Sequence, residues 1–187
     1  MRTLPVTVDD APATLVCASS MGPEDSCLDL LATTPATTVL WVTYSRPPSA
    51  CIDQFRAADA SGSLSVIAVG DLPTPDDDDV TVKSVSTPDD LTGLGITLSQ
   101  ALSANDDAVV CFDSLTTVLR HVATETAYEF LNALTGHLYA ADASAHFHLD
   151  PAAHDPETVD ALASLFDAIV EREDGEWAVR RRRLLRQ

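Results

Sequence analysis

The stretch Ala108-Val109-Val110-Cys111-Phe112-Asp113-Ser114-Leu115 decides the fold of this 187-residue chain. An unbroken apolar run of this length is typical of a strand buried on both faces, as in the middle of a parallel sheet. The run stops at an aspartate and a serine, where polar side chains mark the end of the strand. We therefore expect a central strand at residues 108–112, with Asp113 at its carboxyl end.

Strand-like and helix-like segments alternate on both sides of this run. Further strands are expected at residues 13–18, 38–44, 63–69, 145–149 and 176–184, with a marginal one at 80–85. Helices are expected at residues 24–32, 49–60, 87–103, 115–121, 124–140 and from Asp155 through Val170. Such alternation predicts an α/β fold, a doubly wound and mainly parallel sheet, in a single domain over residues 1–187.

Two parts of the chain resemble the RecA-like ATPases, and more closely their KaiC-like branch. The run ending in Asp113-Ser114-Leu115 resembles the Walker B strand of that branch. Residues 155–183 resemble its final helix, its Asp-Gly turn and a strand with a basic end. The resemblance implies a P-loop fold with the strand order 63–69, 38–44, 108–113, 145–149, 13–18, 176–184. It also implies that the first five strands are parallel and the last antiparallel.

The segment where this family has its phosphate loop departs from the pattern. A phosphate loop needs glycines, a lysine for the phosphates and a hydroxyl for Mg²⁺. When the segment that begins at Ala18 is aligned without gaps to the family's phosphate loop, Glu24 stands in place of the lysine and Asp25 in place of the hydroxyl residue. Pro23 also removes an amide donor. The degenerate loop as a whole comprises Ala18, Ser19, Ser20, Met21, Gly22, Pro23, Glu24 and Asp25. Two anions thus replace a cation beside a site for a polyanion.

The second strand lacks catalytic groups as well. The family's acids that activate water should follow Trp41-Val42-Thr43, but Tyr44-Ser45-Arg46-Pro47 stand there. These departures favour a protein that is not an enzyme and takes no cofactor. We expect a catalytically degenerate RecA/KaiC-like protein that acts as a regulatory or scaffolding subunit. Two alternatives stay open: an ATP-binding protein whose site is completed by a partner, and a DNA-associated accessory protein of the recombinase type.

Other side chains could support chemistry, but each has a simpler interpretation. Asp113 fits Mg²⁺ coordination, although a strand-end aspartate that hydrogen-bonds nearby loops is the preferred interpretation. Ser114 and His121 lack the G-x-S-x-G setting of a nucleophile. His146 and His148 share one strand face and could bind metal with Asp150 and His154, yet the spacing matches no metal motif, and we expect no metal site.

The four cysteines, Cys17, Cys27, Cys51 and Cys111, have no C-x-x-C spacing. We expect all four to be reduced and buried, as small apolar residues in a reducing cytosol.

The composition is strongly acidic. The chain has 29 Asp and Glu residues against 11 Lys and Arg, a formal net charge of −18, and its one lysine is Lys83. Many carboxylates with almost no lysine are typical of proteins from halophilic archaea, whose surfaces must stay hydrated in concentrated salt. The run Asp76–Asp79 is interpreted as part of this solvated surface. No apolar stretch has the length of a membrane span, and no signal peptide is apparent, so a cytoplasmic location is expected.

The basic residues gather at the end of the chain, within the closing strand and tail at residues 176–187. Five lie in the last eight positions: Arg180, Arg181, Arg182, Arg183 and Arg186. Nucleic-acid binding is one interpretation, but high salt weakens it steeply. A second is pairing with acids of the same or another chain. The third, which the resemblance implies, is contact with the nucleotide of a neighbouring subunit. We favour a protein partner, a homo- or hetero-oligomer with RecA/KaiC-like subunits.

Overall fold

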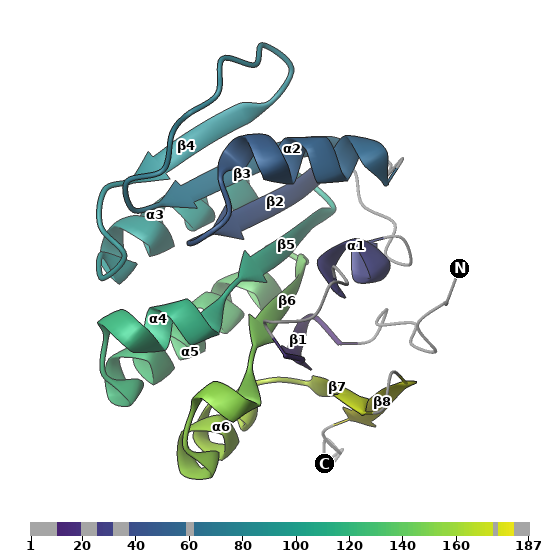
Figure 1. The fold of residues 1–187 in the computed structure, drawn as a ribbon, viewed down its shortest axis with the longest axis vertical. Helices are drawn as coiled ribbons and strands as arrows, with labels where there is room; N and C mark the ends of the chain where they lie inside the picture. The colour runs from purple at the N-terminus through teal and green to yellow at the C-terminus, as the bar shows by residue number, and fades with distance from the viewer. Residues whose placement is uncertain (1–10, 20–25, 32–37, 59–61, 174–175, 182–187) are drawn as a thin grey trace.

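All strands of the described chain join one eight-stranded sheet (Figure 1). The computed structural model describes residues 11–19, 26–31, 38–58, 62–173 and 176–181. The strands are β1 (Ala13–Cys17), β2 (Thr38–Thr43), β3 (Ser63–Val69), β4 (Thr81–Val85), β5 (Ala108–Asp113), β6 (Ser144–Leu149), β7 (Ala168–Glu173) and β8 (Glu176–Arg181). The helices are α1 (Ser26–Leu31), α2 (Pro48–Ala57), α3 (Leu91–Ser103), α4 (Leu115–His121), α5 (Thr124–Ala140) and α6 (Pro156–Ala163), with a short 3₁₀ turn at Pro151–Ala153.

The strand order is β4-β3-β2-β5-β6-β1-β7-β8. Only the β7–β8 pair is antiparallel among the described strands, and the other pairs are parallel. The expected order from residues 63–69 through 13–18 is confirmed, and β5 lies inside the sheet. All of β2 is buried, as are Ala108 to Phe112 of β5, because helices cover both of their faces. The fold is therefore the expected single-domain, doubly wound α/β fold.

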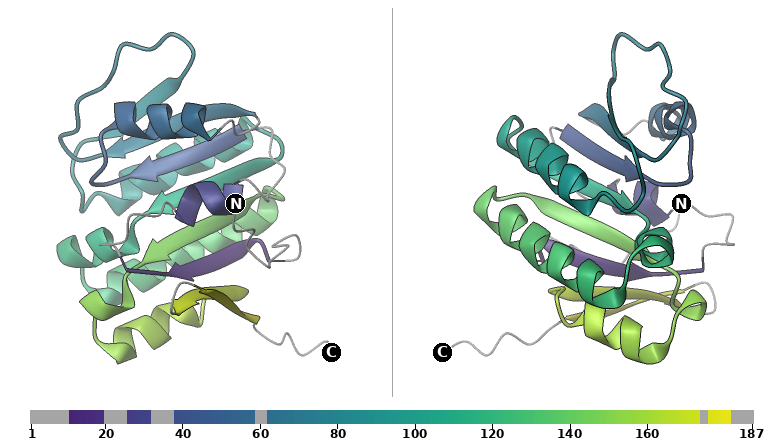
Figure 2. Two further views of the ribbon diagram at one scale, coloured as in Figure 1. Left: turned by 45° about the vertical axis from the view of Figure 1, so that its right-hand side comes forward. Right: turned by 90° about the vertical axis from the view of Figure 1, so that its left-hand side faces the viewer.

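Helices lie on both faces of the sheet (Figure 2). One face packs against α3, α4, α5 and α6 and holds the larger apolar core, which includes Phe112, Phe147 and Phe166. The opposite face packs against α1 and α2 and holds a smaller core around Trp41, Cys51 and Val109. Because successive residues of a strand point to opposite faces, β5 contributes alternate side chains to the two cores, while β6 adds Ala145, Phe147 and Leu149 to the larger one.

The carboxyl-terminal part differs from the expectation. The helix expected from Asp155 through Val170 ends at Ala163, and residues 168–173 form β7, which lies parallel to β1. The closing strand β8 therefore pairs with β7 and not with β1. Ala168 and Val170 of β7 are buried together with Val16 of β1 in a small apolar cluster. Without β7, β1 would be an exposed edge of the sheet. The apolar spacing of Leu165, Phe166, Ile169 and Val170 suits a helix as well as a turn followed by a strand, so periodicity alone gave the wrong element.

Two smaller differences concern β4 and α3. The marginal strand at residues 80–85 does form β4 and extends the sheet beyond β3 as a parallel edge strand. Helix α3 begins at Leu91 and not near Thr87: the Asp90 carboxylate caps it by accepting a hydrogen bond from the Gly93 amide at 2.8 Å. None of the helices in the described ranges is long and apolar enough to cross a membrane.

Candidate functional site

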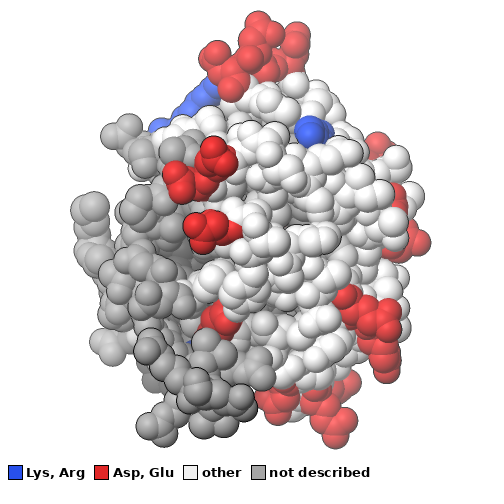
Figure 3. All heavy atoms as spheres, turned by 180° about the vertical axis from the view of Figure 1, so that it is seen from behind, with Lys and Arg blue, Asp and Glu red and all other residues white. Residues whose placement is uncertain are grey.

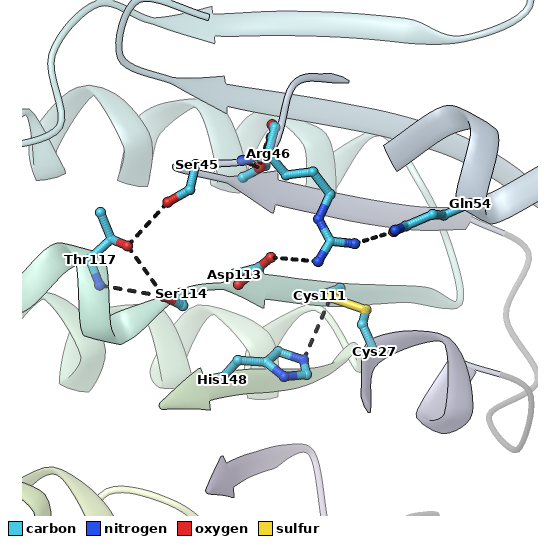
Figure 4. Close-up of polar contacts among 10 residues, drawn as sticks. Cys27, Ser45, Arg46, Gln54, Cys111, Asp113, Ser114, Thr117 and His148 are labelled. Carbon is cyan, nitrogen blue, oxygen red and sulfur yellow. Dashed lines mark hydrogen bonds and ion pairs between the residues drawn. A yellow bond between two sulfur atoms is a disulfide. The ribbon is translucent and has the colours of Figure 1, made fainter. Parts of the chain in front are cut away.

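The carboxyl ends of the inner parallel strands are where ligands bind in open α/β sheets. At this edge the structure brings together Arg46, which follows β2, and Asp113, which ends β5 (Figure 4). The Tyr44 amide donates a hydrogen bond of 3.0 Å to the Asp113 carbonyl, so the two strand ends stay paired past Thr43. This pairing places the turn after β2 beside the aspartate.

A tight turn directs Arg46 back over the strand end. The Thr43 hydroxyl donates to the Arg46 carbonyl at 2.8 Å, and it accepts from the Arg46 amide at 3.1 Å. A threonine at the end of a β-branched strand thus also fixes the first residues of the following loop. The sequence predicts that Asp113 hydrogen-bonds the nearby loops; the hydrogen bonds that fix the loop after β2 are made by Thr43.

The Arg46 guanidinium faces the Asp113 carboxylate. Nη2 of Arg46 lies 3.8 Å from Oδ2 of Asp113, and the two side chains are 29% and 31% exposed. The guanidinium also donates to Oε1 of Gln54 on α2 and lies 5.8 Å from the centre of the Trp41 ring. Asp113, Gln54 and Trp41 therefore hold the Arg46 guanidinium in place. The cation lies at the carboxylate that, by the resemblance to RecA-like ATPases, would coordinate Mg²⁺.

The hydroxyl groups next to Asp113 have structural partners. Ser114 caps α4 by accepting from the Thr117 amide at 3.4 Å, and its hydroxyl lies 3.4 Å from Oγ1 of Thr117. Ser45 approaches the same Thr117 hydroxyl, also at 3.4 Å. His121 is the last residue of α4, at the end opposite to Ser114. The structure therefore shows no contact between Ser114 and His121 that would make the serine a nucleophile.

Only the beginning of the degenerate phosphate loop can be located. Ala18 and Ser19 follow β1, and the Ala18 amide donates to the Leu149 carbonyl at 3.1 Å. Ser20, Met21, Gly22, Pro23, Glu24 and Asp25 lie outside the described residues. That Glu24 occupies the place of the phosphate-binding lysine therefore stays a prediction from the sequence.

The histidines of β6 have other neighbours than the sequence suggested. Asp150 accepts from the Ala152 amide at 3.1 Å and caps the 3₁₀ turn, and it is not a member of the ligand cluster that contains His146 and His148. The side chains that join His146 and His148 are Cys27 and Cys111. No linear motif connects these positions; the one available signal was the pairing of strands 108–113 and 145–149, which sets Cys111 beside His146.

The cysteines correct one expectation. Cys27 of α1 and Cys111 of β5 form a disulfide across 84 residues of sequence, with their Cα atoms 6.4 Å apart, so the expectation of four reduced cysteines is wrong for this pair. The bond is possible because α1 packs directly over β5, which sequence spacing does not reveal. Cys17 and Cys51 are buried thiols as expected. Burial, and to a smaller extent Glu171, raises the pKa of Cys17 to about 11.

His146 is a buried polar side chain without a compensating hydrogen bond. It is 2% exposed, and within the described part of the chain neither ring nitrogen has a hydrogen-bond partner. Burial, followed by the nearby His148, lowers the pKa of His146 to about 3, so the ring is neutral at physiological pH. The two rings lie edge to face, 6.1 Å between their centres.

The basic tail is described only at its start. Arg180 is exposed on β8 and pairs with Glu171 of β7, within the same chain. Arg181 is the last residue of β8, while Arg182, Arg183 and Arg186 lie outside the described residues. Arg180, the tail arginine whose side chain is described, thus meets an acid of its own chain.

Helices α3 and α5 form a surface with few charged residues. Helix α3 contains no charged residue, and α5 contains only Glu125 and Glu129. Seen from this side, the middle of the molecule is uncharged and acidic groups lie mainly around the rim (Figure 3). A groove of about 520 Å³ runs between the helices, and Ile96, which is 55% exposed, lines it. We call this region the α3–α5 surface.

The strand order and the helices on both faces are those of a RecA-like α/β fold, and two solved structures share it. PH0250 from Pyrococcus horikoshii OT3 superposes with a TM-score of 0.62 at 12% identity, over 94% of this chain and 88% of that protein. The flagellar accessory protein FlaH from Methanocaldococcus jannaschii superposes with a TM-score of 0.58 at 14% identity, over 88% of this chain and 74% of FlaH. At such identities the likeness concerns the fold alone.

The chain itself belongs to a family of unknown function, DUF7504, whose model matches residues 13–172. The match runs from the start of β1 into β7 and so includes Arg46, Asp113 and the cysteine–histidine cluster. No curated protein matches the sequence.

Proposed function

We propose that this chain is a RecA-like protein without ATP hydrolysis that acts as a regulatory or scaffolding subunit through protein–protein contact. The observation that carries the proposal is the Arg46–Asp113 pair. A guanidinium held by Gln54 and Trp41 neutralises the carboxylate that would coordinate Mg²⁺, and it follows β2, where the RecA/KaiC-like ATPases have water-activating acids. A cation in this position repels Mg²⁺ and lacks the basicity to activate water.

Calorimetry with Mg-ATP in molar KCl tests the loss of nucleotide binding. We expect no binding tighter than about millimolar and no hydrolysis above buffer, because Glu24 and Asp25 add like charges to the site of a polyanion. Micromolar affinity would contradict the proposal and favour the alternative of an ATP-binding protein completed by a partner.

A gain-of-binding variant sharpens this test. Glu24→Lys with Asp25→Thr restores the two missing groups and should improve ATP binding, with Pro23→Gly added to restore the amide donor. Asp78→Lys with Asp79→Thr is the matched control, since it changes the net charge equally in the exposed loop before β4. An equal gain in the control would assign the effect to overall charge and not to the loop.

The α3–α5 surface supports the interaction part of the proposal, and its occupant is a second copy of the chain. Two copies of a chain with a net charge of −18 repel each other wherever carboxylates meet. The α3–α5 surface lets copies meet with few such contacts, and it exposes Ile96 and an apolar groove. The largely apolar lining of the groove, which includes the exposed Ile96, offers a contact to the second copy.

Light scattering after size-exclusion chromatography in molar KCl measures this association. Ile96→Asp should convert a dimer to a monomer, whereas Tyr128→Asp should not, because Tyr128 is exposed on α5 but does not line the groove. A monomeric wild-type chain, or equal dimers in both variants, would contradict a self-contact at this surface.

The arginine tail remains a proposed contact for a protein partner. Arg182→Gln, Arg183→Gln and Arg186→Gln together remove cations without altering β8. We expect captured RecA-like subunits to be lost from pull-downs at native salt, with nuclease treatment making no difference. Release of the captured material by nuclease alone would favour the DNA-associated alternative.

A further inference from the structure

We propose that, once the Cys27–Cys111 bond is reduced, Cys27, Cys111, His146 and His148 together bind one zinc ion. The four ligand atoms already lie within 4.8 Å of one another. A tetrahedral zinc site with bonds of about 2.0 to 2.3 Å needs donor atoms about 3.3 to 3.8 Å apart. On zinc binding the reduced thiols would therefore separate, and the more distant donor atoms would approach by up to about 1 to 1.5 Å, which rotation of the side chains provides.

Regular structure positions all four ligands. Cys111 and His146 are direct neighbours across the β5–β6 pair, and His148 follows His146 on the same face of β6. Helix α1 lies over this face and brings in Cys27. Sites built on helices and strands hold their ligands more accurately than sites on loops. Figure 4 shows His148 directed at Cys111, 3.7 Å from Sγ to Nε2.

The ligand set selects the metal. Two thiolates and two imidazoles are the donors of structural zinc sites, whereas Mg²⁺ and Ca²⁺ require oxygen ligands, which this cluster does not offer. Two thiolates also cancel the charge of Zn²⁺, so the loaded site is neutral. A neutral complex suits a location where Cys27, Cys111 and His146 are all buried.

His146 supplies an independent observation. An imidazole that is 2% exposed, with no hydrogen-bond partner for either nitrogen among the described residues, is unfavourable in an apolar core. A metal ion at the cluster gives one of these nitrogens a partner. His148 is only partly buried, so it offers the ion a route from solvent.

The disulfide and the metal are alternative states of the same pair of sulfurs. A dithiol reductant passes two electrons and two protons to the bond, becomes a disulfide itself and leaves two thiols on the chain. Zinc then displaces both thiol protons and binds the two thiolates. With four protein ligands no coordination position stays open, so the site fastens α1 to the sheet and does not catalyse.

Metal content after purification tests the site. The full chain is reduced with a phosphine, which takes oxygen from water as the disulfide becomes two thiols, and is then incubated with Zn²⁺ and desalted. We expect about one zinc per reduced chain and less than about a tenth in the oxidised chain. Co²⁺ in place of zinc should give the absorption bands of tetrahedral cobalt bound to thiolate. Absence of retained zinc in the reduced chain would overturn the proposal.

Matched variants assign the ligands. Cys111→Ser and His148→Asn should each lower zinc retention at least tenfold, while Cys51→Ser and His154→Asn should leave it unchanged. Cys51 is a suitable control because it is a buried cysteine of the same apolar core. X-ray absorption spectroscopy of the zinc-loaded wild-type chain measures the zinc ligands directly and does not depend on whether any variant folds. Two sulfur and two nitrogen ligands support the site, and any other set overturns it.

Discussion

The two faces of the sheet use the same strands for different purposes. On the face covered by α3, α5 and α6, β5 and β6 present Phe112 and Phe147, whose ring centres are 5.4 Å apart in a continuous apolar core. On the face covered by α1 and α2, the adjacent residues Cys111 and His146 form a polar cluster that includes a disulfide. One pair of strands thus supports an apolar core on one side and a polar cluster on the other.

The two faces differ in how their buried atoms are satisfied. The aromatic side is mostly apolar, with the buried Tyr44 hydroxyl as an exception, so its contribution depends mainly on close packing. The cysteine–histidine side contains buried nitrogens without hydrogen bonds, which natural cores keep few in number. Substitutions on the two faces should therefore differ in size and, for one residue, in sign.

The largest effect should come from the aromatic side. Phe147→Ala removes a fully buried ring that contacts Phe112 and, at 5.1 Å between ring centres, Phe166. We expect the free energy of unfolding to fall by about 3 to 5 kcal/mol, because a cavity remains in a large core. Chemical denaturation in molar KCl measures the loss. A loss below about 1 kcal/mol would mean that this core is not closely packed.

The next effect is reduction of the disulfide. Opening a link across 84 residues of sequence releases the unfolded chain, so the free energy of unfolding should fall by about 2 to 4 kcal/mol. Denaturation with and without a phosphine reductant, in the presence of a chelator, checks this. The variant Cys51→Ser should respond to the reductant as the wild type does. If zinc binds as proposed, adding it to the reduced chain should restore much of the lost stability.

His146→Leu should have a small effect of opposite sign. In the oxidised, metal-free chain, replacing a buried imidazole without hydrogen bonds by an apolar group of similar size should be neutral or should stabilise by up to about 1 kcal/mol. Thermal unfolding of the oxidised wild type and variant measures the difference. A clear destabilisation would reveal a hydrogen-bond partner for His146 among the segments outside the described residues.

Arg46→Ala should have the smallest effect on stability. The Arg46–Asp113 pair is about one-third exposed, and ion pairs of this kind contribute about 1 kcal/mol or less. Arg56→Ala, which removes the exposed Arg56–Asp77 pair at 3.1 Å, is the control and should behave similarly. A loss of several kcal/mol for Arg46→Ala alone would show that the pair holds the sheet edge together and is not primarily a functional replacement.

Much of the fold was predictable because it depends on local pattern. The apolar runs at residues 38–43 and 108–112 are long enough to indicate strands buried on both faces, and they occupy the interior of the sheet. The β7 strand was missed because Leu165, Phe166, Ile169 and Val170 have helix-compatible spacing. Only the need of β1 for a second neighbour selects a strand there, and that need arises in the assembled sheet.

The site was less predictable because it depends on contacts between distant residues. The strand-end position of Asp113 followed from the sequence, and so did the absence of catalytic acids after β2. The position of Arg46 against Asp113 did not follow, since it results from the Thr43 turn and from Gln54 on α2. The cysteine–histidine cluster joins residues 27, 111, 146 and 148, and no spacing rule connects them until β5, β6 and α1 are packed.

The strand order also has a consequence for synthesis. Strand β1 hydrogen-bonds only to β6 and β7, whereas β2, β3 and β5 are neighbours formed from residues 38–113. A ribosome therefore delivers β1 long before its partners, and at about 5 to 20 residues per second the interval up to β6 is on the order of ten seconds. During that time the apolar segment Ala13–Cys17 has no place in the sheet. Among the described strands, the earliest to be made is thus among the last to be placed, so the nascent chain must keep it from aggregating until its partner strands emerge.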